Sequence, residues 1–162
     1  MKKRVYIETT IVSYLTAKPS RDLIMAAHQE ITREWWEHQR AAYDLRVSQF
    51  VLDEAGDGDP DAAARRLAVL RDIPVLADSL DARALAKALV GQGLLPRTAG
   101  IDALHLTMAT VHEVHVLMTW NCRHLANASK FDHIRFVNSE LGLFCPILTT
   151  PVELLGYEED GQ

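Results

Sequence analysis

The residues of this chain best suited to chemistry are three carboxylates and an amide that lie beside apolar segments: Glu8, Glu54, Asp102 and Asn121. Oxygen ligands of this kind suit hard cations such as Mg²⁺ or Mn²⁺ and do not suit zinc. Carboxylates held close together repel one another, so a divalent cation would give them a physical reason to coexist in the ionised form. If the fold brings these residues together, we expect a metal site.

Most of these positions also have a structural interpretation. Glu8 could accept hydrogen bonds from the first turn of a helix that starts at Thr9 or Thr10. Asp102 falls in the first turn of an expected helix, where an acid compensates the helix dipole. Asn121 could form a turn or start a helix. Their joint placement beside strand ends and a helix start favours a shared site over independent caps.

Two histidines and an arginine lie close to these positions in the sequence. His105 is one turn beyond Asp102, and His124 is three residues past Asn121, so either histidine could move a proton or contact a phosphate. The alternatives are a hydrogen-bonded neighbour of the helix for His105 and a surface residue for His124. Arg123 could hold a phosphate together with His124, although a solvated arginine near a helix start fits equally well.

Expected strands and helices alternate along the chain. β-branched, aromatic and apolar runs predict strands at 4–7, 45–48, 74–76 and 115–120. Apolar residues at helical spacing predict helices at 9–15, 20–40, 50–54, 61–71, 79–90 and 98–112. Ser20 is the expected N-cap of the second helix. Strands joined through helices pair in parallel, so the predicted fold is a three-layer α/β/α arrangement with a central, mainly parallel sheet.

This fold would gather the candidate residues at one edge of the sheet. Functional groups of such folds lie at the carboxyl ends of the strands. Glu8 ends the first expected strand, Asn121 ends the last, and Glu54 lies just past the second. Asp53 is adjacent to Glu54, so we expect one of these two acids to face inward and the other outward, and the pattern does not say which.

Length and composition fit a single domain that spans residues 1–162. Hydrophobic residues make up 48% of the chain, which is ample for one core. The net charge of −5 argues against a domain that coats nucleic acid by bulk electrostatics, so any such contact must be local and helped by cations. A nucleotide-binding α/β domain is disfavoured, because no GxGxxG or Walker-type loop follows any strand.

Other features of the sequence predict a cytoplasmic protein without a membrane span. The apolar runs are broken well before the length of about 18 residues that a spanning helix needs. The basic start runs straight into a strand-like segment, so a secretory signal is not expected. Cys122 and Cys145 lack metal-ligand spacing and are expected as free thiols. Trp35 and Trp36 extend a helical apolar stripe and should serve packing.

Four segments of the chain together resemble the PIN-domain family, and within it the VapC-like toxins of bacterial type II toxin–antitoxin pairs. The segments span residues 4 to about 128, stand in the family's order, and read VYIETTIVSYL, VSQFVLDE, AGIDALHLTMA and LMTWNCRHLANA. The ending CPILTTPVELLG is also similar to this family. The resemblance implies an endoribonuclease that depends on Mg²⁺ or Mn²⁺ and a parallel sheet with its acids clustered at one end.

Carried over residue by residue, the resemblance places the family's four acidic positions on Glu8, Glu54, Asp102 and Asn121. It places the hydroxyl that often follows the first acid on Thr9 or Thr10, and it implies an RNA substrate, a small antitoxin protein that covers the site, and a homodimer.

Two positions depart from the family's usual pattern. Glu8 stands where Asp is usual, and its extra methylene places the carboxylate farther from the strand end. Asn121 stands where Asp is frequent, and it keeps a carbonyl oxygen but loses a charge. The number of metal ions in the site, one or two, therefore stays open. Both variants belong to a branch of VapC-like sequences that this chain resembles. The competing hypothesis is a catalytically weak PIN-like module that binds RNA or a protein without cutting.

Overall fold

A four-stranded parallel sheet lies at the centre of the structure, a computed structural model that describes residues 1–156. The strands are β1 (Arg4–Ile7), β2 (Asp44–Arg46), β3 (Val116–Met118) and β4 (Ile147–Thr149). They lie in the order β2-β1-β3-β4, and every pairing is parallel. Val5 lies opposite Leu45 on one side and Val116 on the other. The central pair therefore joins the start of the chain to a segment more than a hundred residues later.

The two central strands are apolar because they are covered on both faces. Val5, Tyr6 and Ile7 of β1 have no exposed surface, and neither do Leu117 and Met118 of β3. Strands of parallel sheets buried in this way read as continuous apolar runs without alternation. Both predicted central strands are therefore confirmed, with β3 shorter at each end than the expected range.

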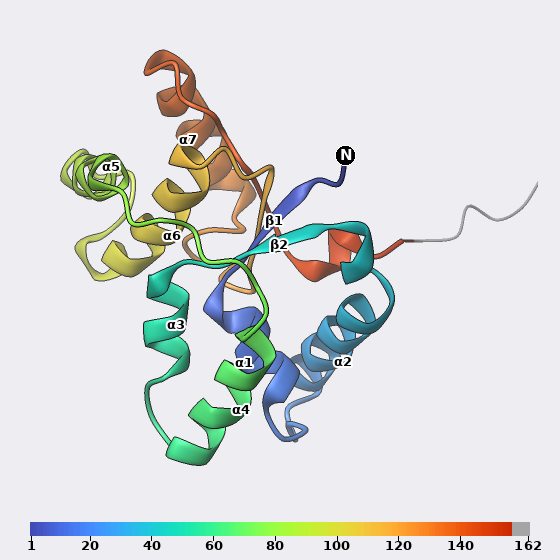
Figure 1. Cartoon of the computed structure of the whole chain (residues 1–162). Helices are drawn as coiled ribbons and strands as arrows, with labels where there is room; N and C mark the ends of the chain where they lie inside the picture. The colour runs from blue at the N-terminus through green and yellow to red at the C-terminus, as the bar shows by residue number, and fades with distance from the viewer. Residues whose placement is uncertain (157–162) are drawn as a thin grey trace, which may run out of the picture.

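Seven helices surround the sheet in the described part of the chain. They are α1 (Thr9–Thr16), α2 (Leu23–His38), α3 (Gln49–Ala55), α4 (Pro60–Leu70), α5 (Leu80–Gly91), α6 (Gly100–Val111) and α7 (Ala128–Glu140). Short 3₁₀ segments lie at Arg40–Ala42, Arg97–Ala99 and Pro151–Leu154. Figure 1 shows α5, α6 and α7 on one side of the sheet and α2 on the other. The predicted α/β/α class with a parallel sheet is confirmed.

The start of α2 differs from the predicted one. Asp22, not Ser20, is its N-cap, and Oδ1 of Asp22 accepts a hydrogen bond of 2.8 Å from the backbone N–H of Met25. The Ser20 hydroxyl accepts instead from the backbone N–H of Asp22, at 3.1 Å. The Ser20 assignment is therefore wrong by two residues, because both side chains suit a cap and the apolar stripe does not distinguish them.

Three elements near the edges of the sheet also differ from the expectation. The strand expected at 74–76 is reduced to one parallel bridge between Val47 and Val75. Helix α7 and strand β4 were not predicted. Within α7 only Ile134 and Asn138 are buried, so its sequence lacks a clear apolar stripe. Strand β4 has three residues and exposes Ile147 at the sheet edge.

Several smaller expectations can be compared with the structure. Trp35 has no exposed surface and Trp36 is buried within the hydrophobic core, so both serve packing as expected. Cys122 and Cys145 are free thiols. Among residues 1–156, no helix combines the length and apolar character needed to cross a membrane.

Candidate metal centre

Glu8 lies at the carboxyl end of β1 and is also the N-cap of α1. Its Oε2 accepts hydrogen bonds from the backbone N–H of Thr10 at 3.0 Å, from the Thr10 hydroxyl, and from the Thr119 hydroxyl at 2.7 Å. Only 3% of the residue is exposed. The capping interpretation is thus correct, and the donors on Oε2 offset part of the cost of burying a carboxylate.

Glu54 of α3 approaches the same place from a different element. Its Oε1 accepts from the Thr9 hydroxyl at 2.7 Å and lies 2.6 Å from Nε2 of His105 in α6. The neighbouring acid, Asp53, is exposed and accepts from the side chain of Gln49. Of the two adjacent acids, Glu54 is therefore the one that faces inward.

The environment of Glu54 favours its ionised form. Partial burial acts to raise the pKa of this carboxyl. The hydrogen bonds of His105 and Thr9 to the carboxylate oppose that effect, and the pKa lies below its ordinary value. Glu54 is thus a carboxylate at neutral pH.

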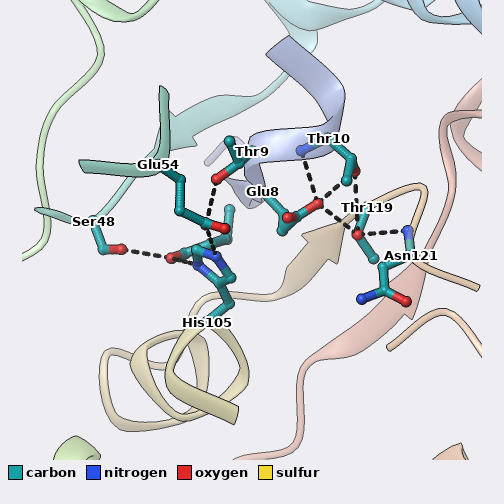
Figure 2. A network of polar contacts seen from close by, with 9 residues as sticks. Glu8, Thr9, Thr10, Ser48, Glu54, His105, Thr119 and Asn121 are labelled. Carbon is teal, nitrogen blue, oxygen red and sulfur yellow. Dashed lines mark hydrogen bonds and ion pairs between the residues drawn. The ribbon is translucent and has the colours of Figure 1, made fainter. Parts of the chain in front are cut away.

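Glu8, Glu54 and His105 form a compact group whose potential ligand atoms all lie within 4.8 Å of one another. Figure 2 shows the two glutamates pointing toward one another between α1 and α6. The donors described above engage Oε2 of Glu8 and Oε1 of Glu54, and no hydrogen bond within residues 1–156 reaches the other oxygen of either group. Each carboxylate therefore has one oxygen held by the protein and one available.

The charge of this group is not neutralised by basic side chains. Among residues 1–156, no lysine or arginine forms an ion pair with Glu8, Glu54 or Asp102. Two facing carboxylates without such a partner repel one another in a site of low dielectric. The available carboxylate oxygens of Glu8 and Glu54 are the kind of ligand that Mg²⁺ or Mn²⁺ prefers, and their negative charge also favours a bound cation.

Asp102 and Asn121 lie outside this group of three and meet at His124. Oδ2 of Asp102 is 3.0 Å from Nδ1 of His124, and Oδ1 of Asn121 accepts from the backbone N–H of His124, also at 3.0 Å. The side chains of Asp102 and His124 are only 13% and 16% exposed. The surface interpretation of His124 is therefore wrong, because its ring is held against an acid.

Thr119 connects the two groups. Its hydroxyl donates to Oε2 of Glu8 at 2.7 Å and accepts from the backbone N–H of Asn121 at 2.9 Å. The structure thus brings Glu8 and Glu54 together directly and links Asn121 and Asp102 to them through one hydroxyl and one histidine. Of the remaining candidates, Thr9 and Thr10 each hold one glutamate, and Arg123 is exposed.

Three hydroxyls of the site were not anticipated: Tyr6, Ser48 and Thr119. Thr119 falls within the expected strand 115–120, two residues before Asn121. Tyr6 and Ser48 fall at the ends of two expected neighbouring strands, a signal that could have placed them near Glu8 and Glu54.

Fold and site together define an α/β protein with paired carboxylates at the carboxyl end of a parallel sheet. No protein-family model matches the chain, and no curated protein sequence matches it. Among solved structures, the chain is similar to a crystal structure of VapBC2 from Rickettsia felis, in which VapBC2 is bound to a DNA fragment from its promoter. The identity is 16%, the TM-score is 0.47, and the match covers 74% of this chain and 89% of that one. The α/β class rests on the sheet and helices of this chain itself.

Proposed function

We propose that this protein is a PIN-like endoribonuclease that hydrolyses phosphodiester bonds of RNA with Mg²⁺ or Mn²⁺. The observation that carries the proposal is the pair of facing carboxylates, Glu8 and Glu54, each with one oxygen fixed and one available. Such a pair at the carboxyl edge of a parallel sheet offers the oxygen ligands that a divalent cation prefers.

The chain offers a set of ligands and partners for this chemistry. Glu8 and Glu54 would hold the cation directly, and Asp102 and Asn121 would complete the site from the side of His124. When bound, the cation supplies the Lewis acidity that makes water a nucleophile near neutral pH.

The protein's own groups would orient the reactants. Thr9, Thr10 and Thr119 restrict the two glutamates by hydrogen bonds, so little rearrangement is needed when the ligands engage. His124, paired with Asp102, is placed to accept or return a proton at the edge of the site. Arg123 is exposed beside it and could contact a phosphate.

The cellular role follows from the resemblance of the sequence motifs to VapC-like toxins. On that basis the protein would act in the cytoplasm as the toxin of a type II pair, bind a small antitoxin that covers the site, and form a homodimer. The net charge of −5 fits a protein whose contact with RNA is local and assisted by cations.

Cleavage of mixed single-stranded RNAs tests the enzymatic proposal. Wild type should release product with Mn²⁺ or Mg²⁺ and none with EDTA. Glu54→Gln and Asp102→Asn should each lower kcat by at least about 100-fold, the usual effect of removing one group that stabilises charge in a reaction centre. Asp53→Asn, which alters the exposed neighbouring acid, is the matched control and should cleave as wild type does. If wild type and Glu54→Gln release the same low amount of product, the proposal that the protein is a nuclease is wrong.

A second candidate function is a PIN-like module that binds RNA or a protein without cutting. It is favoured by the capping role of Glu8 and by the pairing of Asp102 with His124, because both interactions stabilise the fold without a metal. Fluorescence anisotropy with a labelled form of the same RNA distinguishes the two. Binding that survives in EDTA, with no product under any metal condition, would support the module.

The toxin role has its own test. Induced expression in a bacterial host should arrest growth, and Glu54→Gln should not. A short reading frame beside the gene, with a DNA-binding start and an amphipathic tail, should relieve the arrest when co-expressed. If wild type and Glu54→Gln affect growth equally, the growth effect does not depend on this site and the toxin role fails.

A further inference from the structure

A buried line of hydrogen-bonding groups leads from the core to Glu54. The Ser48 hydroxyl lies 2.6 Å from the Tyr6 hydroxyl, which lies 2.6 Å from Nδ1 of His105. Nε2 of His105 lies 2.6 Å from Oε1 of Glu54. Ser48, Tyr6 and His105 have no exposed surface, and they come from three separate parts of the chain. Figure 2 shows Ser48, His105 and Glu54 along this line.

The positions of the protons along this line follow from the number of donors. Tyr6 has one hydroxyl proton, and burial raises its pKa, so the group stays protonated. If Ser48 donates to Tyr6 and Tyr6 donates to Nδ1 of His105, the ring carries its proton on Nε2 and donates to Glu54. Every group is then satisfied.

The opposite direction leaves groups unsatisfied. If Nδ1 of His105 donated to Tyr6 and Tyr6 donated to Ser48, a neutral ring would turn a bare Nε2 toward a carboxylate oxygen 2.6 Å away. The Ser48 hydroxyl would also need a further acceptor, and within residues 1–156 its only side-chain hydrogen bond is to Tyr6. An unmade hydrogen bond at a fully buried hydroxyl is costly.

We propose that His105 is a positioning residue that holds Oε1 of Glu54 through Nε2–H, and that Ser48 and Tyr6 fix its tautomer. This inference rests on the proposed function, because it concerns the orientation of a proposed metal ligand. Thr9 and His105 both bind Oε1, so Oε2 is the oxygen left for the cation. Partners of this kind orient ligands in many metal sites and affect metal affinity.

The alternative is that His105 itself binds the cation through Nε2. The distances within the group of three permit it, but the ring would have to give up its bond to Glu54 and move its proton to Nδ1. A nitrogen ligand would also shift the preference of the site from Mg²⁺ toward zinc or nickel. The two roles therefore differ in the tautomer of His105.

Nitrogen-15 NMR of histidine-labelled protein measures that tautomer directly. We expect His105, assigned by comparison with His105→Gln, to be a neutral ring with its proton on Nε2, both before and after addition of Mg²⁺. A proton on Nδ1, two protons on the ring, or loss of the Nε2 proton when Mg²⁺ is added would overturn the proposal. This measurement does not depend on catalysis.

Mn²⁺ affinity, followed by the EPR signal of the free ion, tests the positioning effect. His105→Leu removes the donor and should weaken binding about 10- to 100-fold, the range seen when a partner of a metal ligand is lost. His105→Gln places an amide N–H near the original Nε2 and should recover most of the affinity. His112→Leu changes the C-cap residue of the same helix, whose ring bonds within residues 1–156 to the carbonyl of Ala77, and this control should bind as wild type does.

The outcomes separate this inference from the proposed function. If His105→Gln binds Mn²⁺ as weakly as His105→Leu, or if neither changes the affinity, the positioning role fails while the nuclease can stand. If wild type binds Mn²⁺ but cuts no RNA, the nuclease fails and the positioning role stands. Should His105→Leu not fold, Ser48→Ala replaces it, and we expect a mixture of His105 tautomers in place of one.

Discussion

The two oxygens of the Glu8 carboxylate have different surroundings. Oε2 receives three protein donors, whereas Oε1 receives none within the described residues. Capping satisfies the helix end and fixes the side chain, but it does not neutralise the charge, because the donors are neutral groups. The extra methylene of Glu relative to Asp allows both uses at once, since the side chain can reach back to the N–H of Thr10 and still face Glu54.

A substitution of Glu8 should therefore distinguish its role as a helix cap from its role as a metal ligand. In Glu8→Gln the carbonyl oxygen can still accept from Thr10, so the free energy of unfolding should fall by no more than about 1 kcal/mol. The lost charge should weaken Mn²⁺ binding at least about tenfold, because a unit charge near 4 Å from a cation contributes several kcal/mol at the dielectric of a protein. Urea unfolding and Mn²⁺ titration measure the two effects. Unchanged Mn²⁺ affinity would remove Glu8 from the metal site.

Glu54 should make folding stability depend on pH. Its pKa is lower in the folded state than in the unfolded chain, where it is about 4.3. The stability it contributes is therefore fully present above that value and is lost as pH falls through the folded-state pKa. The difference in unfolding free energy between wild type and Glu54→Gln should shrink between pH 6 and pH 3, as measured by urea unfolding. A difference that stays constant over this range would contradict the lowered pKa.

At the scale of elements, the central parts of the fold could be predicted and the edges could not. Residues 5–7 of β1 and all of β3 are continuous apolar runs, and α1 follows directly after Glu8, so the local pattern was sufficient. Strand β4 is a short edge strand, and α7 packs through few buried residues, so neither has a strong pattern. Their places are determined by tertiary contact, which a single sequence does not display.

The site shows the same division. Placement of Glu8 and Asn121 at strand ends followed from the parallel topology, whereas Glu54, which lies in α3 past the second strand, was expected there mainly from the family resemblance. The contact between Glu54 and His105 joins residues 51 positions apart on two helices, and nothing local signals it. The link from Asp102 to His124 depends in the same way on how α6 lies against the loop after β3.

The corrected start of α2 can be tested by comparing two neighbouring caps. Asp22→Ala removes the acceptor for the N–H of Met25 and should lower the free energy of unfolding by about 1 kcal/mol, the usual cost of losing an N-cap. Ser20→Ala removes a bond that lies outside the helix and should cost less. Urea unfolding of both variants measures the difference. A larger loss in Ser20→Ala would show that the helix begins earlier than in the structure.

At the scale of the whole molecule, the candidate site joins parts of the chain that are far apart in sequence. Glu8 follows β1, Glu54 belongs to α3, His105 to α6, and Thr119 follows β3. Apart from Arg4, the residues of the central strands beneath them are buried, so the sheet is a rigid support for groups that arrive from different elements. A cation bound between them would connect these elements in the folded state only.

Mn²⁺ should therefore stabilise the fold as a whole. A ligand that binds only the folded state adds about 2.7 kcal/mol to the free energy of unfolding at 100 times its Kd. Wild type and Asp53→Asn should both show this increase in urea unfolding with Mn²⁺, and EDTA should reverse it. Glu54→Gln should show little of it, because the variant lacks one of the two facing carboxylates. If Glu54→Gln gains as much stability as wild type, the stabilising ion binds elsewhere, and the facing carboxylates serve the fold alone.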